Sequence, residues 1–274
     1  MNITFLGGGN MATALIGGMV SGGVDAREFR VVEPLRAQQD KLVGLFPGIG
    51  AFGEVSAGAV AGAEIVVLAV KPQQLRVVAQ AVARHVVDVP VVMTIAAGVR
   101  LADVSRWMDG YQRLVRAMPN TPALIREGIS GAFALPDAGA RGRGLAQRVL
   151  DAVGAVLWVS REDMLDAVTA VSGSGPAYVF YFLEGLEQAA QELGFTKVDA
   201  RTLARATFAG TVKLACGSEL EPAMLRAQVT SKGGTTEAAV ALLEADAVKA
   251  RFVAAVKAAA ARAKELGDAL GAEE

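Results

Sequence analysis

Short apolar runs alternate with helical patterns through the first half of the chain. Five of the runs are bounded by Gly, Pro or Asn, as buried parallel strands often are, and they cover Ile3–Leu6, Arg30–Glu33, Ile65–Val70, Val91–Ile95 and Leu114–Ala117. The segments between them favour helices, over Met11–Ser21, Leu35–Leu45, Gln73–Val87 and Leu101–Met108. Two further strands, Gly131–Leu135 and Ala155–Val159, flank a helix over Arg141–Val153. This alternation predicts an α/β domain with a doubly wound, mostly parallel sheet.

The strand pattern ends near Ser160, and the rest of the chain is patterned as helices. We expect them over Asp163–Val171, Ala177–Leu193, Asp199–Cys216, Pro222–Val229, Thr236–Ala245 and Ala247–Leu266. Gly194 and Gly217 stand where helices should end, and Asp199 is an expected N-cap. The sequence therefore predicts two domains, an α/β domain over residues 1–160 and an all-α domain over residues 161–274.

The predicted helix 177–193 is apolar on nearly every face. Its apolar side chains are Tyr178, Val179, Phe180, Phe182, Leu183 and Leu186. A helix without a polar face must be covered on all sides, which the helical domain cannot easily do alone. We expect dimerisation with a second copy through this helix; the alternative is burial within the chain's own bundle.

Composition excludes several classes of protein. Among the 274 residues, 27 Lys and Arg stand against 28 Asp and Glu, giving a net charge of -1. The absence of a basic excess argues against binding to nucleic acid or to a membrane surface. One cysteine, Cys216, allows no internal disulfide and no thiolate metal site, which favours a reducing, cytoplasmic compartment. His85 is the single histidine, so we expect neither a Ser-His-Asp triad nor a metal site, and we place His85 on the surface.

The amino-terminal segment has no charge from Asn2 to Val24. Glycines, Asn10 and two threonines interrupt it, and no Lys or Arg precedes it, so it matches neither a signal peptide nor a membrane span. A buried strand, turn and helix explain its apolar character.

A glycine-rich turn follows the first predicted strand and opens the first helix. It has the pattern G-x-G-x-x-A and consists of Gly7, Gly8, Gly9, Asn10, Met11 and Ala12. In such turns the glycines allow a tight bend and a close approach of the backbone to a pyrophosphate. Glu33 ends the second strand, where an acidic residue commonly binds the ribose. The sequence predicts a dinucleotide site.

Further polar and glycine-rich segments follow the later strands and open two helices. In an open parallel sheet ligands bind beyond the carboxyl ends of the strands, where Lys71 is a candidate ribose or nicotinamide contact, with a solvated lysine as the alternative. Segments 172–178 and 230–236 each lead into a helix start, and the second offers backbone amides and hydroxyls suited to a carboxylate. An ordinary capped helix start would have the same composition.

Five motifs, taken together, closely resemble pyrroline-5-carboxylate reductase, the last enzyme of proline biosynthesis. They are L-G-G-G-N-M-A at 6–12, A-V-K-P-Q at 69–73, R-A-M-P-N-T-P at 116–122, S-G-S-G-P-A-Y at 172–178 and T-S-K-G-G-T-T at 230–236. The resemblance implies reduction of 1-pyrroline-5-carboxylate to L-proline with NADPH or NADH. It also implies a Rossmann domain followed by a helical dimerisation domain, with dimers that assemble further.

The resemblance also implies site residues. The cofactor would contact Gly7 to Ala12, Ala69, Val70, Lys71, Pro72, Ala96, Ala97 and Gly98. The substrate would contact Ser231, Gly233, Gly234, Thr235 and Thr236, with Glu162 and Glu219 near the pocket. Thr236 would lie nearest the ring nitrogen as the catalytic hydroxyl, and we favour an orienting role for it over proton donation.

Two positions depart from the family pattern. Many members have polar residues after the second strand that hold a 2′-phosphate, whereas this chain has Glu33, which would repel a phosphate, and Arg36, which would attract one. Ser56 stands where an asparagine is frequent, which weakens a cofactor contact there. The choice between NADPH and NADH is therefore open.

Two other functions compete with this interpretation. A β-hydroxyacid dehydrogenase would have a lysine four residues beyond the second-domain G-x-G, where this chain has Val179. A non-catalytic dinucleotide sensor or scaffold would need no second anion site at 230–236.

Overall fold

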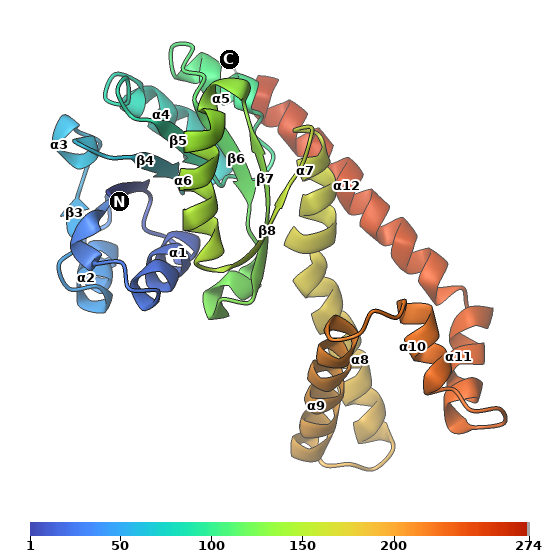
Figure 1. Ribbon diagram of the computed structural model, residues 1–274. Helices are drawn as coiled ribbons and strands as arrows, with labels where there is room; N and C mark the ends of the chain where they lie inside the picture. The colour runs from blue at the N-terminus through green and yellow to red at the C-terminus, as the bar shows by residue number, and fades with distance from the viewer. Residues whose placement is uncertain (273–274) are drawn as a thin grey trace. The chain divides into compact units, whose positions relative to one another are not determined.

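The computed structural model describes residues 1–272 and contains two compact units (Figure 1). The first comprises Met1–Ser174 and the chain from Ala259 onward, and the second comprises Gly175–Ala258. Residues 161–174 group with the sheet because α7 (Met164–Val168) packs on strands β6 and β7. The domain boundary that the sequence predicts between residues 160 and 161 stays a prediction.

The first unit is built on one eight-stranded sheet in the order β3-β2-β1-β4-β5-β6-β7-β8. Its strands are β1 Ile3–Leu6, β2 Phe29–Val32, β3 Gly50–Phe52, β4 Ile65–Leu68, β5 Val91–Thr94, β6 Leu114–Met118, β7 Gly128–Ala134 and β8 Gly154–Trp158. All neighbouring strands are parallel except β6 and β7. The predicted mostly parallel sheet is confirmed, and β3 is an additional strand at its edge.

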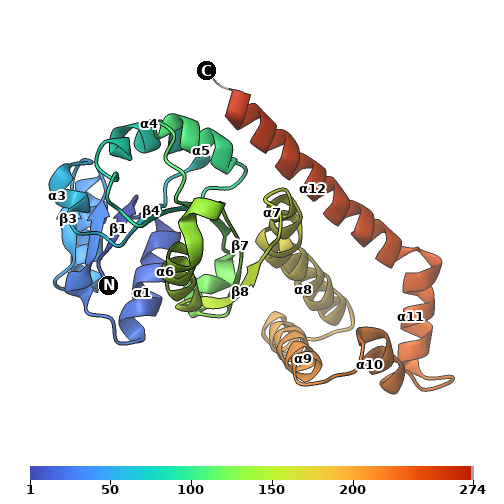
Figure 2. The same ribbon diagram turned by 45° about the horizontal axis from the view of Figure 1, so that its top comes forward.

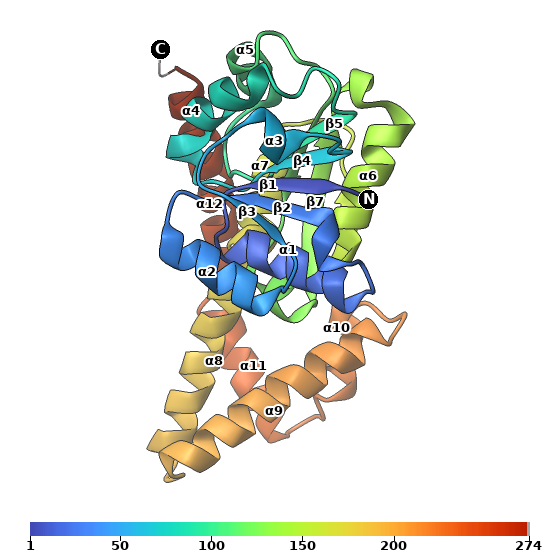
Figure 3. The same ribbon diagram turned by 90° about the vertical axis from the view of Figure 1, so that its left-hand side faces the viewer.

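Helices cover both faces of this sheet, as Figures 2 and 3 show. One face carries α1 (Asn10–Ser21), α2 (Arg36–Leu45) and α6 (Gly139–Asp151). The other carries α3 (Ala57–Val60), α4 (Pro72–Ala83) and α5 (Leu101–Trp107). Strands β1, β4 and β5 are buried along their whole length, which explains why their sequences are apolar runs rather than alternating patterns.

Short helical segments complete the first unit. Three 3-10 helices cover Ala26–Glu28, Thr121–Ile125 and Pro136–Ala138. Helix α7 continues as a π-helix over Thr169–Gly173, where a single α-helix over 163–171 was expected. His85 lies just past α4 and is half-buried.

The second unit is all helical. It contains α8 (Gly175–Glu192), α9 (Lys197–Cys216), α10 (Pro222–Gln228), α11 (Thr235–Ala245) and the first part of α12 (Val248–Ala272). Helices α8 and α9 pack together. Helix α8 ends two residues before Gly194, which has φ +102°, and α9 ends directly before its C-cap Gly217, as predicted. No helix within residues 1–272 is both long and apolar enough to span a bilayer.

The predicted N-cap of α9 is wrong by three residues. Thr196 caps the helix, because its Oγ1 accepts the N–H of Asp199 at 3.2 Å and donates to the Asp199 carboxylate at 2.7 Å. Asp199 therefore lies in the first turn, where its negative charge interacts favourably with the positive end of the helix dipole.

Helix α8 exposes large apolar side chains within this chain. Phe180 is 61% exposed and Tyr181 is 72% exposed. A continuous group of such side chains is typical of a surface that another protein chain covers, which agrees with the expected dimerisation through this helix.

Candidate active site

The carboxyl ends of β1, β4, β5 and β6 meet at one edge of the sheet, and backbone hydrogen bonds join the loops there. Gly7 N–H donates to Val32 O at 2.8 Å, and Ala69 N–H donates to Leu6 O at 2.8 Å. The order of strands reverses between β1 and β4, which is the switch point where open α/β sheets bind their ligands. The predicted loops after β1 and β4 are thus brought together.

The glycine turn fits a dinucleotide. Gly7 has φ +101°, and a Cβ added there would lie 2.7 Å from Ala69 O. A Cβ on Gly9 would meet nothing within 4 Å, and no side chain caps α1, whose N-cap is Gly9. Free amides at an uncapped helix start, beside open space, form a cradle for a pyrophosphate.

Glu33 is buried against this turn. Its carboxylate accepts the N–H of Gly8 at 3.0 Å and the N–H of Leu35 at 3.0 Å, and the residue is 9% exposed. The side chain therefore fixes the glycine turn to the start of α2, and its negative charge stands where a ribose is expected.

The side chains of three other predicted cofactor residues differ in their exposure and in their hydrogen-bond partners. Arg36 is 83% exposed and pairs with Asp40 at 3.0 Å. Ser56 is the N-cap of α3, where its Oγ accepts the N–H of Ala59 at 3.4 Å. Lys71 is exposed at the N-cap of α4. Of the predicted cofactor residues, Arg36 and Lys71 are thus the two with exposed cationic side chains.

The loop after β5 is supported from behind by the last helix. Gly98 has φ +84°, and a Cβ added to Gly267 of α12 would lie 2.6 Å from Gly98 O. Ala96 N–H donates to Thr94 Oγ1 at 3.2 Å. Close backbone packing therefore sets the shape of the expected cofactor loop 96–98.

Helix α11 in the second unit begins inside the segment 230–236. Its N-cap is Gly234, and no side chain caps the helix. The first amides of an α-helix have no partner within the helix. The N–H groups of Thr235 and Thr236 are therefore available to an anion, and the Thr236 side chain is half-buried.

The amides of the two preceding glycines are already engaged. Glu237 reaches back to accept the N–H of Gly233 at 2.6 Å, and Gly234 N–H donates to Ser231 O at 3.1 Å. Within residues 233–236, Thr235 and Thr236 are thus those whose backbone donors are free. Glu219 is exposed and lies between α9 and α10.

Glu162 belongs to a buried network of charges. Its Oε1 accepts the N–H of Leu101 at 2.7 Å and pairs with Arg116 Nη1 at 3.1 Å. Arg116 Nη2 lies 3.5 Å from Asp166 Oδ1, and Arg100 Nη2 lies 3.0 Å from Asp166 Oδ2. The substrate contact predicted for Glu162 stays a prediction; in this structure its carboxylate joins β6, α5 and α7.

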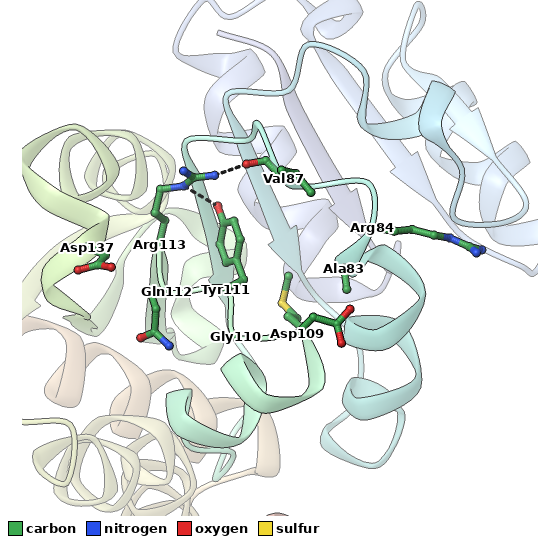
Figure 4. A pocket seen from close by; sticks show the side chains of 10 residues that line it. Ala83, Arg84, Val87, Asp109, Gly110, Tyr111, Gln112, Arg113 and Asp137 are labelled. Atoms are coloured by element: carbon green, nitrogen blue, oxygen red, sulfur yellow. Dashed lines mark hydrogen bonds between the residues drawn. The ribbon is translucent and has the colours of Figure 1, made fainter.

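A separate hollow lies at the opposite, amino end of the strands (Figure 4). Arg113 donates to Val87 O and faces Tyr111, whose OH donates to Val89 O at 2.7 Å. Burial raises the pKa of the Tyr111 phenol, which keeps it protonated as a donor. Arg84 points away from these groups in Figure 4, so the polar side chains do not converge on a ligand.

The fold and the site define the class of protein. A mostly parallel sheet with a glycine cradle at its switch point is typical of dinucleotide-dependent oxidoreductases. A family model described as NADP oxidoreductase, coenzyme F420-dependent, matches residues 2–98, and one described as pyrroline-5-carboxylate reductase dimerisation matches residues 162–266.

The chain belongs to the pyrroline-5-carboxylate reductase family. It is 43% identical over 269 residues to the pyrroline-5-carboxylate reductase of Pseudomonas aeruginosa, covering 98% of each chain. A solved pyrroline-5-carboxylate reductase from Coxiella burnetii is 38% identical with a TM-score of 0.91, covering 97% of this chain and 98% of that one. A Plasmodium falciparum pyrroline carboxylate reductase, solved with NADP bound, is 23% identical with a TM-score of 0.86 over the same shares and has the same fold.

Proposed function

We infer that the chain catalyses the NAD(P)H-dependent reduction of 1-pyrroline-5-carboxylate to L-proline, the last step of proline biosynthesis. The observation that carries this inference is a family match along the whole chain combined with an open glycine cradle at the switch point of the sheet. The gene should let a proline auxotroph that lacks this reductase grow without proline. Failure to grow, with the protein present and able to bind a dinucleotide, would contradict the inference.

The residues of the first unit would hold the cofactor. The amides at the start of α1 would bind the pyrophosphate, and Gly9 leaves room for the close approach. Loops 69–72 and 96–98 would shape the rest of the site at the same edge of the sheet. A bound reduced nicotinamide supplies a hydride, so the protein itself needs no redox group.

The residues of the second unit would hold the substrate. The amides of Thr235 and Thr236 would bind its carboxylate at the positive end of α11. The Thr236 hydroxyl would accept or donate a hydrogen bond at the ring nitrogen and so fix which carbon faces the cofactor. Hydride addition to the carbon of a protonated C=N group would leave a neutral amine, which then takes up a proton from water to give the protonated amine of proline. An iminium substrate carries its own proton before the hydride arrives, so the chain needs chiefly to hold the two reactants in position.

Replacement of Thr236 with valine tests this role. Valine keeps the shape and removes the hydroxyl, so we expect kcat to fall by about tenfold to a hundredfold, a loss of the size that a small misplacement of the reactants can cause. The Kd for NADPH should be unchanged, and Thr236→Ser, which keeps the hydroxyl, should retain most of the activity. Equal turnover in Thr236→Val and the wild type would remove Thr236 from the mechanism.

Replacement of Arg36 with glutamine tests whether this arginine helps to distinguish NADPH from NADH. Arg36 is exposed, so its contact with a 2′-phosphate should contribute about 1 kcal/mol, and kcat/KM with NADPH should fall by about fivefold. The value with NADH should not change. Arg84→Gln, at an exposed arginine on the opposite end of the strands, is the control. An equal loss with both cofactors would exclude a specific phosphate contact.

The family places the chain among homo-oligomers through its dimerisation domain. We propose that dimers of this chain assemble into a larger homo-oligomer and that it works in the cytoplasm. The exposed apolar side chains of α8 support the dimer from which such an assembly would be built, and the single, unpaired Cys216 supports the cytoplasmic location.

A further inference from the structure

Asn120 joins two of the sequence motifs that are far apart along the chain. Its Nδ2 donates to Ser172 O at 3.2 Å, and its Oδ1 accepts the N–H of Ile129 at 2.9 Å. The residue is 9% exposed. The amide nitrogen and the amide oxygen of Asn120 therefore each make a hydrogen bond to the backbone of another segment.

The Ser172 carbonyl needs a donor from outside its own helix. In an α-helix it would accept the N–H of the residue four positions on, which is Pro176. Proline has no N–H, and Ser172 is half-buried, where a carbonyl without a donor is costly. The chain forms a π-helix over Thr169–Gly173 at this point, and the Asn120 amide supplies the missing hydrogen bond.

Ile129 needs an acceptor for a related reason. Strands β6 and β7 are antiparallel, and their pairing ends at Met118 opposite Gly131. The same register would place Asn120 opposite Ile129, but the backbone turns away after Pro119. The Asn120 side chain therefore adds one hydrogen bond to the β6–β7 pairing, beyond the point where the backbone of β6 turns away.

These contacts place the π-helix at the cofactor edge of the sheet. A Cβ added to Gly173 would lie 2.8 Å from Met118 Cε, at the carboxyl end of β6. This is the edge that carries the glycine turn and the loop 96–98. The π-helix leads directly into Gly175 and the chain of the second unit. A shift of Ser172 would therefore move the point at which the substrate-binding half begins.

We propose that Asn120 is a positioning residue for hydride transfer, acting through Ser172 to fix the π-helix against the carboxyl end of β6. This inference rests on the proposed function. It requires one donor and one acceptor on a short side chain, which asparagine provides. An ionised aspartate would keep the acceptor for Ile129 but would turn an oxygen toward the Ser172 carbonyl.

The test compares Asn120→Asp with the wild type in the reduction of 1-pyrroline-5-carboxylate. We expect kcat to fall by about tenfold or more, as small misplacements of reactants do, while the Kd for NADPH stays within about twofold because the glycine cradle is untouched. Asn2→Asp, at an exposed amide, is the matched control and should behave as the wild type.

The pH dependence separates positioning from general damage to the fold. A protonated carboxyl at 120 can again donate to Ser172 O, and burial raises its pKa. The kcat of Asn120→Asp relative to the wild type should therefore rise as the pH falls. If this variant does not fold, Asn120→Ser, which adds no charge, should show the loss of kcat without recovery at low pH.

The outcomes distinguish the two levels of the argument. If the wild type is active and Asn120→Asp has the same kcat, this inference alone is overturned. A parallel loss of NADPH affinity, or a ratio of kcat values that does not change with pH, would also overturn it. No turnover by the wild type would overturn the proposed function and this inference with it.

Discussion

Replacing Arg116 with methionine should lower the free energy of unfolding by about 3–5 kcal/mol, the cost of breaking a buried ion pair from one side. Arg116 lies in β6 and is 2% exposed. Its guanidinium faces Glu162 at 3.1 Å and Asp166 at 3.5 Å. Asp166 Oδ1 is buried without a hydrogen bond, so it depends on this charge. Removal of the arginine would leave the Glu162 carboxylate without its cation and Asp166 with Arg100 alone.

Urea unfolding at a fixed protein concentration measures this loss, because an oligomer's stability depends on concentration. The matched control is Arg161→Met, whose partner Asp163 lies at 3.0 Å but where both side chains are exposed. That pair should contribute little to the free energy of unfolding, because water solvates both of its charges. If the two variants lose equal stability, the buried network does not hold the unit together.

The second large effect is expected in the glycine turn, where two neighbouring substitutions should behave differently. Gly7→Ala would force a Cβ into a left-handed backbone at φ +101° and to within 2.7 Å of Ala69 O. Such strain costs about 1–3 kcal/mol, so both folding and cofactor binding should suffer. Gly9→Ala meets nothing in the protein, so it should fold normally yet raise the Kd for NADPH by about tenfold or more.

Thermal unfolding and titration with NADPH separate the two cases. Gly144→Ala, at an exposed position inside α6 with open space around it, is the control and should keep both properties or gain slightly in stability. Unchanged NADPH affinity in Gly9→Ala would show that the open space at Gly9 is not where the pyrophosphate lies.

Much of the fold can be predicted from the sequence because parallel strands that are buried on both faces have continuous apolar sequences. Residues Ile3–Leu6 are fully buried and appear as predicted. The edge strand Gly50–Phe52 was missed because its three residues are only partly buried and contain no apolar run. Helix α3 was missed for a similar reason, since it has only four residues, Ala57–Val60.

Less of the site can be predicted, because side-chain partners come from distant parts of the chain. The glycine turn is predicted from its spacing together with its place between a strand and a helix and the acidic Glu33 at the end of the next strand. Arg116 was overlooked, although an arginine inside an apolar strand signals a buried partner. The pairing of Glu162 and the bonds of Asn120 depend on how β6, β7 and α7 meet, which no local pattern records.

The most direct test of the account is the initial rate of 1-pyrroline-5-carboxylate reduction, measured in parallel with NADPH and NADH at matched concentrations. We expect clear turnover with at least one cofactor, and the ratio of the two kcat/KM values then shows whether the charge of Glu33 or of Arg36 determines which ribose is bound. No turnover with either, by protein that binds a dinucleotide, would contradict this expectation. A sensor or a reductase of another imine would then explain the fold.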